Sequence, residues 1–190
     1  MTVEIRDVSK SYGDARVLQN VSLTLEPGVT CLAAPSGAGK TTLVRILLGL
    51  EQPGSGFVTG LEAARLSAVF QEDRLLDRLD AAGNLCFVLG RDYDETQAAV
   101  LLGELGLGDA GGKAAGEYSG GMKRRLALAR ALSAPFDFLA LDEPFTGLDG
   151  ENRKRAIDCI RRRTAGKTVL VVTHNSEDAV GLDARTVKLE

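Results

Sequence analysis

A glycine-rich stretch at residues 34–42, with the sequence APSGAGKTT, carries the strongest chemical signal in this chain. It lies between an apolar run and a segment with helical apolar spacing, which is the context that a phosphate-binding loop requires. Glycines let the backbone N–H groups of such a loop point inward, and the start of the following helix favours an anion. Lys40 is placed to reach β- and γ-phosphates, and Thr41 to ligate Mg²⁺. The pattern usually opens with glycine, whereas Ala34 stands here. The competing interpretation is a plain glycine-rich turn.

Two adjacent carboxylates, Asp142 and Glu143, follow the apolar run FDFLAL at 136–141. A carboxylate at the end of a buried strand beside a phosphate loop is where a water-mediated Mg²⁺ ligand belongs. Glu143 could polarise an attacking water molecule. Taken alone the pair is a weak signal, because two such residues are just as common in a helix cap or a solvated loop.

Three further features are weak singly. Ser119, Gly120 and Gly121 open an expected helix and offer a second set of backbone N–H groups to an anion. His174, the only histidine, ends the strand-like run TVLVVT, and Gln71 ends the run LSAVF, where its oxygen could face the phosphate loop. The alternatives are a simple turn, a structural histidine and an unremarkable glutamine.

Buried strands that alternate with helices must position these residues. The apolar runs predict strands at 29–34, 66–70, 136–141, 168–173 and, at an edge, 185–190, with helices at 39–50, 121–132 and 151–164. Such alternation is typical of an α/β fold in which helices cover a mostly parallel sheet.

Two segments depart from this alternation. Residues 2–8 and 16–25 alternate apolar and polar around Gly13-Asp14, which predicts an antiparallel β hairpin. Residues 74–132 show no strand pattern, and we expect them to form a helical subdomain inserted into the α/β core. The whole chain, 1–190, is interpreted as a single nucleotide-binding domain.

Composition restricts the function classes. The formal net charge of −3 lacks the basic excess of a protein that holds nucleic acid through its phosphates. No apolar run reaches about 18 residues, and the N-terminus lacks the pattern of a secretory signal. Cys31, Cys86 and Cys159 form no metal pattern and are expected to be reduced packing thiols. The arginine-rich segments 153–155 and 161–163 are expected on a solvated helix face.

The order of all these features resembles the ATP-binding-cassette (ABC) family of ATPases. The stretch YSGGMKRRLALARAL at 118–132 looks like the signature region of that family, and LALDEPFTGLD looks like its Walker B segment and D-loop. The resemblance covers nearly the whole chain. It departs from the usual pattern at Tyr118, where leucine is common, and at Met122, where glutamine is common. It implies a P-loop NTPase core with an N-terminal antiparallel β subdomain and an inserted helical subdomain.

The resemblance also implies roles for individual residues. Glu143 would be the general base, His174 would contact the γ-phosphate, and Lys40 would complete the catalytic set. Residues implied in holding ATP are Tyr12 (stacked on adenine), Pro35, Ser36, Gly37, Ala38, Gly39, Lys40, Thr41, Thr42, Gln71, Asp142, Ser119, Gly120 and Gly121. Thr41, Gln71 and, through water, Asp142 would bind Mg²⁺. Asp149 would lie at a dimer interface.

The partners implied are membrane permease subunits, a second copy of the chain in an ATP-dependent head-to-tail homodimer, and an extracytoplasmic solute-binding protein. Such a subunit would be cytoplasmic, on the inner face of the cell membrane, and near-minimal, since the chain ends soon after His174. YSGGM and the stretch 70–76 resemble the branch of nitrate, sulfonate and taurine importers, although Asp77-Arg78 replaces the Pro-Trp pair frequent there. The alternative is a soluble ABC ATPase acting on DNA or the ribosome. The intact Lys40, Glu143 and His174 argue against a nucleotide-binding adaptor without turnover, and a small-molecule kinase or GTPase would leave the Ser-Gly-Gly segment unexplained.

Overall fold

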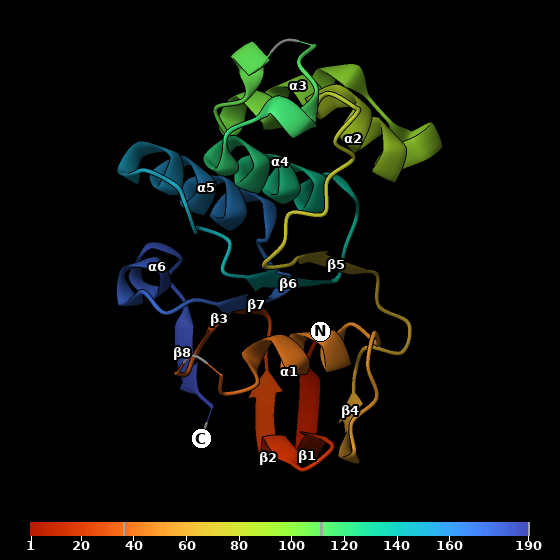
Figure 1. The fold of residues 1–190 in the computed structure, drawn as a ribbon, viewed down its shortest axis with the longest axis vertical. Helices are drawn as coiled ribbons and strands as arrows, with labels where there is room; N and C mark the ends of the chain where they lie inside the picture. The colour runs from red at the N-terminus through yellow and green to blue at the C-terminus, as the bar shows by residue number, and fades with distance from the viewer. Residues whose placement is uncertain (36, 111, 190) are drawn as a thin grey trace. The chain divides into compact units, whose positions relative to one another are not determined.

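The structure is a computed structural model and describes residues 1–35, 37–110 and 112–189 (Figure 1). The chain divides into two compact units. The first comprises Met1–Ala68, Phe136–Asp142 and Thr164–Glu190, and the second comprises Val69–Pro135 and Glu143–Arg163. The first unit contains the sheets, and the second contains most of the helices.

The first unit is built on a five-stranded sheet of order β5-β6-β7-β3-β8. Its strands are β3 (Gly28–Ala33), β5 (Leu66–Val69), β6 (Phe138–Asp142), β7 (Thr168–Val172) and β8 (Arg185–Lys188). β3 runs parallel to β7 and β8, and β6 runs parallel to β7. Every residue of β6 and β7 is buried, as the two apolar runs predicted. The expected parallel sheet, with its edge strand near the C-terminus, is confirmed.

A three-stranded antiparallel sheet of order β2-β1-β4 completes this unit. β1 (Val3–Tyr12) pairs with β2 (Ala15–Leu25) around the expected turn, so the predicted hairpin is confirmed. β4 (Ser55–Thr59) was not expected, because its Pro- and Gly-rich start reads as a loop. It forms by pairing with β1, with Arg6 opposite Phe57, and that partner is distant in sequence.

Two helices belong to the first unit. α1 (Lys40–Leu47) follows the glycine-rich loop, buries Leu43, Val44, Ile46 and Leu47, and is shorter than the 39–50 expected. α6 (Ser176–Gly181) was not expected. Its start is capped by the Asn175 side chain, which accepts from the Glu177 N–H at 2.9 Å. At six residues, it is too short to show an apolar period.

The second unit packs four helices around a core of fully buried leucines, among them Leu85, Leu101, Leu126 and Leu128. They are α2 (Ala81–Leu89), α3 (Glu95–Glu104), α4 (Gly120–Ser133) and α5 (Gly150–Arg163). α5 contacts both α3 and α4. Because α5 packs on these helices, the helical unit also includes Glu143–Arg163. The expected boundaries of 74–132 leave this segment out.

The segment before α2 is a loop and not the helix expected from residue 74 onward. Fully buried Asn84 holds it: its side-chain oxygen accepts from the Leu76 N–H at 3.0 Å, and its amide donates to the Leu76 carbonyl at 3.1 Å. The thiol expectation also needs one correction. Cys31 and Cys159 are buried, but Cys86 is exposed on α2.

Candidate nucleotide-binding site

The loop between β3 and α1 is shaped by its glycines. Gly37 and Gly39 have φ values of 82° and 81°, in the left-handed region that side chains rarely adopt. A Cβ on Gly39 would lie 2.6 Å from both the Val17 carbonyl oxygen and a Leu18 methyl group of β2. Ser36, expected in this loop, lies outside the described residues. The loop thus needs glycine for its backbone conformation and, at Gly39, for its close approach to β2.

Lys40, the first residue of α1, points back into the loop. Its ammonium group donates to the carbonyl oxygens of Ala34 at 2.7 Å and Pro35 at 2.8 Å. The Ala38 N–H donates to the Pro35 carbonyl at 3.3 Å. The Lys40 ammonium therefore lies against the backbone of the loop, just before the first turn of α1. This arrangement favours the binding of a phosphate group.

The hydroxyl of Thr41 and the carboxylate of Asp142 meet across 101 sequence positions. Thr41 donates to Asp142 Oδ2 at 2.7 Å, and Asp142 is almost fully buried at the end of β6. Hydroxyl and carboxylate oxygens are suitable ligands for Mg²⁺, which typically takes one or two carboxylates together with substrate phosphates. Within the described ranges, no group of three or more acidic, histidine or cysteine residues is arranged to hold a metal ion by itself. The donor set therefore fits a cation that is held together with a bound nucleotide.

His174 lies two residues after the end of β7, and the sheet register places that strand end. Leu32 of β3 lies beside Val172 of β7. The end of β3, which leads into the glycine-rich loop, is therefore next to the end of β7, which leads to His174. Asp142 lies beside the same Val172. The carboxyl ends of β6, β7 and β3 thus bring Asp142, His174 and the loop to one edge of the sheet.

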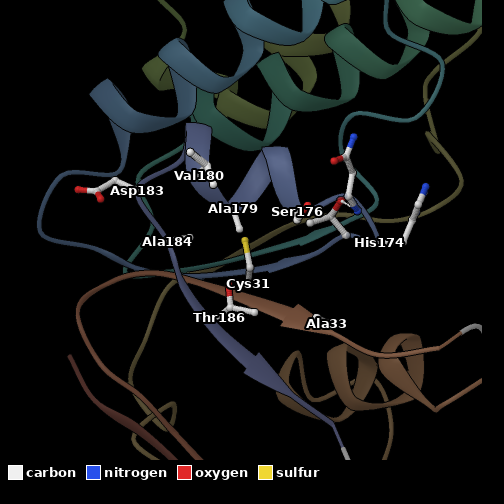
Figure 2. A pocket seen from close by; sticks show the side chains of 11 residues that line it. Cys31, Ala33, His174, Ser176, Ala179, Val180, Asp183, Ala184 and Thr186 are labelled. Atoms are coloured by element: carbon white, nitrogen blue, oxygen red, sulfur yellow. Dashed lines mark hydrogen bonds between the residues drawn. The ribbon is translucent and has the colours of Figure 1, made fainter.

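A cavity of about 490 Å³ adjoins His174 in the first unit (Figure 2). It is lined mainly by small residues of β3, α6 and β8, and Cys31 points its sulfur toward Ala179. Burial, together with the charge of Asp178, raises the pKa of the Cys31 thiol to about 11. Asp178 accepts a hydrogen bond from Thr173 at 2.6 Å and thereby fixes the residue before His174. Asp178 was not among the residues expected from the sequence, although Asn-Ser-Glu-Asp is a recognisable helix start.

Tyr12 lies at the end of β1 with its side chain about half exposed. Its hydroxyl donates to Glu51 Oε1 at 2.5 Å, and the Lys10 ammonium lies 5.4 Å from the ring centroid. The hydrogen bond from Tyr12 is the main cause of a lowered pKa of Glu51. The hydrogen bond and charge of Lys10 and the charge of Arg45 act in the same direction, and together these effects outweigh desolvation. The ring is thus anchored through its hydroxyl.

In the second unit, Ser119 caps α4. Its Oγ accepts from the Met122 N–H at 3.3 Å, which leaves Gly120 and Gly121 in the first helical turn. A Cβ on Gly121 would lie 3.0 Å from the Gly147 carbonyl oxygen. Asp149 accepts from the Asn152 N–H at 2.8 Å, and the hydrogen bonds from Asn152 are the main cause of its lowered pKa.

Gln71 and Glu143 also belong to the second unit. The Gln71 side chain is exposed, while its backbone carbonyl accepts from Arg124 of α4, a contact that the sequence analysis did not anticipate. Glu143 follows Asp142 in the chain and has a φ of 51°, in the left-handed region that is costly for a residue with a side chain. Its carbonyl accepts from the Thr146 N–H at 3.3 Å.

Comparison with known proteins identifies the class. The family model described as "ABC transporter" matches residues 18–146. The chain is 38% identical to a protein of Pseudomonas aeruginosa named "Aliphatic sulfonates import ATP-binding protein SsuB 1", over 97% of this chain and 80% of that protein. It is 39% identical to a protein of the same name from Rhodococcus jostii, over 98% of this chain and 78% of that protein. A "Sulfate/thiosulfate import ATP-binding protein CysA" from Anthoceros angustus is 35% identical over the whole chain, which spans 54% of that protein.

Solved structures agree with this result. The "Dimeric Structure of MJ0796, a Bacterial ABC Transporter Cassette" matches with a TM-score of 0.85 and 25% identity, over 98% of this chain and 94% of that chain. The same cassette in a post-hydrolysis state, "bound to ADP and Pi", matches with a TM-score of 0.86 and 26% identity, over 99% and 94%.

The fold and the loop thus define a P-loop ATPase of the cassette class. The chain belongs to the ABC transporter family and is an ATP-binding, ATP-hydrolysing member of it.

Proposed function

We propose that this chain energises the import of a small oxyanion, of the aliphatic sulfonate class, through separate membrane subunits. The names of its relatives in Pseudomonas aeruginosa and Rhodococcus jostii support the importer assignment and the substrate class. They do not favour the alternative of a soluble ATPase that acts on DNA or the ribosome. Among the described residues, no helix has the length and apolar character needed to cross a membrane. Partner subunits are proposed to supply the transport path, as the names of the import ATP-binding relatives suggest.

The contact between Thr41 and Asp142 is the observation that carries the assignment of the ATP site. On nucleotide binding, the Lys40 ammonium exchanges the carbonyls of Ala34 and Pro35 for phosphate oxygens. The loop N–H groups surround the phosphates, and the Tyr12 ring stacks on the adenine. Thr41, Gln71 and, through water, Asp142 would hold Mg²⁺, which neutralises phosphate charge when bound.

Hydrolysis needs a group that takes a proton from water. Glu143 is proposed as this general base, because it directly follows Asp142 at the end of β6. His174 is proposed to contact the γ-phosphate from the end of β7. The hydrogen bond between Thr173 and Asp178 restricts the backbone from which His174 projects.

The working unit is proposed to be an ATP-dependent head-to-tail homodimer. Each chain carries two anion-binding elements, the loop at 34–42 and the start of α4, on its two units. Two-fold symmetry lets Ser119, Gly120 and Gly121 of one chain bind the γ-phosphate held by the other chain's loop. The similar solved cassette is dimeric, which supports the homodimer.

The permease is proposed to dock on the helical unit, close to the segment that follows Gln71. α2 exposes Phe87 at 68% and Val88 at 43%, and apolar groups this exposed are candidates for a protein interface. A solute-binding protein outside the membrane would deliver the oxyanion to the permease.

The decisive experiment measures ATP hydrolysis and ATP affinity separately. Glu143→Gln keeps the side-chain shape but removes the base, so hydrolysis should fall by about 10²–10⁴-fold while ATP binding persists. Hydrolysis at the wild-type rate would exclude Glu143 as the base.

Import is tested in proteoliposomes that contain the chain and the permease subunits that co-purify with it. Uptake of an aliphatic sulfonate should require ATP and be lost with Glu143→Gln. Phe87→Asp should abolish uptake without changing ATP affinity. Val180→Asp, at a still more exposed apolar position on α6 of the other unit, should leave uptake intact. Uptake that is unaffected by Phe87→Asp would remove this surface from the permease interface.

A further inference from the structure

Arg124 is a buried arginine in the second turn of α4, and only 5% of it is exposed. Its guanidinium donates to the Phe70 carbonyl at 2.7 Å and to the Gln71 carbonyl through its other terminal nitrogen. Asp73 Oδ1 lies 3.3 Å from the same group. All of these residues belong to the helical unit. The Arg124 side chain of α4 thus contacts three residues of the segment that contains Gln71.

The backbone carbonyls of Phe70 and Gln71 need the Arg124 guanidinium as a hydrogen-bond donor. β5 ends at Val69, so the carbonyls of Phe70 and Gln71 lie beyond the strand. Both accept their hydrogen bonds in a partly buried setting, where a backbone carbonyl without a donor is costly. The guanidinium is a planar fork that can donate to two acceptors at once, whereas lysine is a flexible point charge. Within the same segment, the Arg74 guanidinium lies 4.0 Å from the centroid of the Phe70 ring.

The contacts of Arg124 differ from those of its neighbour. Arg125 is equally buried but donates to Leu105, Gly106 and Gly121, all within the helices and their turns. Arg124 instead joins α4, which begins at Ser119–Gly121, to the backbone of Gln71, whose own side chain is exposed. A proposed phosphate-binding helix start and a proposed Mg²⁺ ligand are therefore fixed to one another through a single side chain.

We propose that Arg124 is a positioning residue that holds the Gln71 backbone on α4, so that the Gln71 side chain and the Ser119–Gly121 helix start move as one body. This inference rests on the proposed function, because it uses the Mg²⁺ role of Gln71. Arg124 itself contacts neither nucleotide nor metal.

The first test compares the affinity for a non-hydrolysable ATP analogue with and without Mg²⁺, by calorimetry on the full chain. The ratio of the two affinities measures what Mg²⁺ ligands contribute and does not depend on turnover. Gln71→Ala should lower this ratio. Arg124→Gln should lower it by about threefold or more, within the range of coupled neighbours. Arg163→Gln, which removes an arginine contact with Glu104 in the same unit, should leave it unchanged.

The double variant decides whether Arg124 acts through Gln71. If it does, Gln71→Ala with Arg124→Gln lowers the ratio no further than the larger single change. Effects that multiply, or an unchanged ratio in Arg124→Gln, would overturn the proposal. Arg124→Lys should give an affinity ratio between those of Arg124→Gln and wild type. If Arg124→Gln does not fold, the comparison is made with Arg124→Lys, whose ratio should lie below that of wild type. If the wild-type chain binds the ATP analogue equally well with and without Mg²⁺, the proposed Mg²⁺ site is contradicted instead.

Amide hydrogen exchange gives a second, independent readout. Peptides that cover residues 70–76 should exchange faster in Arg124→Gln than in wild type, while peptides of α3 keep their protection. Arg163→Gln should leave 70–76 unchanged. Equal exchange of 70–76 in wild type and Arg124→Gln would show that the arginine does not hold this segment.

Discussion

The two glycine-rich elements proposed to bind phosphate use glycine for different reasons. In the loop of the first unit, Gly37 and Gly39 have left-handed backbones, and Gly39 also lies against β2. At the start of α4 in the second unit, Gly120 has ordinary helical backbone, and a Cβ there would meet nothing within 4 Å. The loop therefore depends on backbone conformation. The helix start depends on free N–H groups and the Ser119 cap.

The largest expected difference comes from alanine substitution of these glycines. Gly39→Ala combines left-handed strain with overlap against β2, costs of about 1–2 and 1–3 kcal/mol respectively, so ATP binding should be lost. Gly37→Ala carries only the strain, since a Cβ there has nothing within 4 Å, and should weaken binding less. Gly120→Ala should leave ATP affinity of the monomer unchanged. Equal losses of ATP affinity in all three variants would contradict the proposed difference between the loop and the helix start.

Lys40→Ala tests charge in the loop. The ammonium group is proposed to leave two carbonyls for phosphate, and charge-assisted hydrogen bonds contribute about 1.5–3 kcal/mol each. ATP affinity should therefore fall by roughly tenfold or more, with the fold retained. Lys154→Ala, an exposed lysine of α5, is the control and should bind ATP normally. Unchanged affinity in Lys40→Ala by calorimetry would contradict the placement of the phosphates.

Ser119→Arg tests the helix start, and its effect should appear only in assembly. In the Glu143→Gln background with ATP and Mg²⁺, the chain should shift from monomer to dimer. Ser119→Arg should prevent this shift by filling the anion site, without loss of ATP binding by the monomer. Thr96→Arg places the same charge in the first turn of α3 and should leave dimerisation intact. Light scattering gives the masses, and a dimer indifferent to Ser119→Arg would place the interface elsewhere.

The smallest expected effect concerns acid stability, and it again separates the units. In the first unit, hydrogen bonds from Arg65 at 3.0 Å hold the pKa of Asp137 well below its ordinary value of 3.8. A carboxyl with a lowered folded-state pKa contributes stability that is present above 3.8 and is lost progressively as pH falls below it. Arg65→Gln should lower the melting temperature slightly at pH 7, since exposed pairs are weak.

The difference between wild type and Arg65→Gln should shrink from about pH 4 down to pH 2. In the second unit, burial raises the pKa of Glu104, but hydrogen bonds from Arg163 and Cys159 outweigh it, and the pKa is lowered overall. Arg163→Gln should therefore show a similar trend that starts at slightly higher pH. Melting curves between pH 2 and 7 provide the check. A difference for Arg65→Gln that stays constant over this range would rule out Asp137 as the titrating group.

Much of the fold could be predicted because its signals are local. The strands β3, β6 and β7 are short apolar runs, the hairpin has an alternating pattern around Gly13-Asp14, and the loop at 34–42 is a contiguous motif. β4 and α6 were missed, because the first forms through pairing with a distant strand and the second is six residues long, too short to show an apolar period.

The sequence alone determined the family, the loop and the order of the candidate site residues, since each of these is written in neighbouring residues. Only the tertiary structure decided which distant groups meet: Thr41 with Asp142 across 101 positions, and Arg124 with Phe70 across 54. It also placed Glu143–Arg163 with the helices and not with the sheet. The physical reason is the same in each case: the packing of whole elements brings these groups within hydrogen-bonding distance, and no local pattern of residues records that packing.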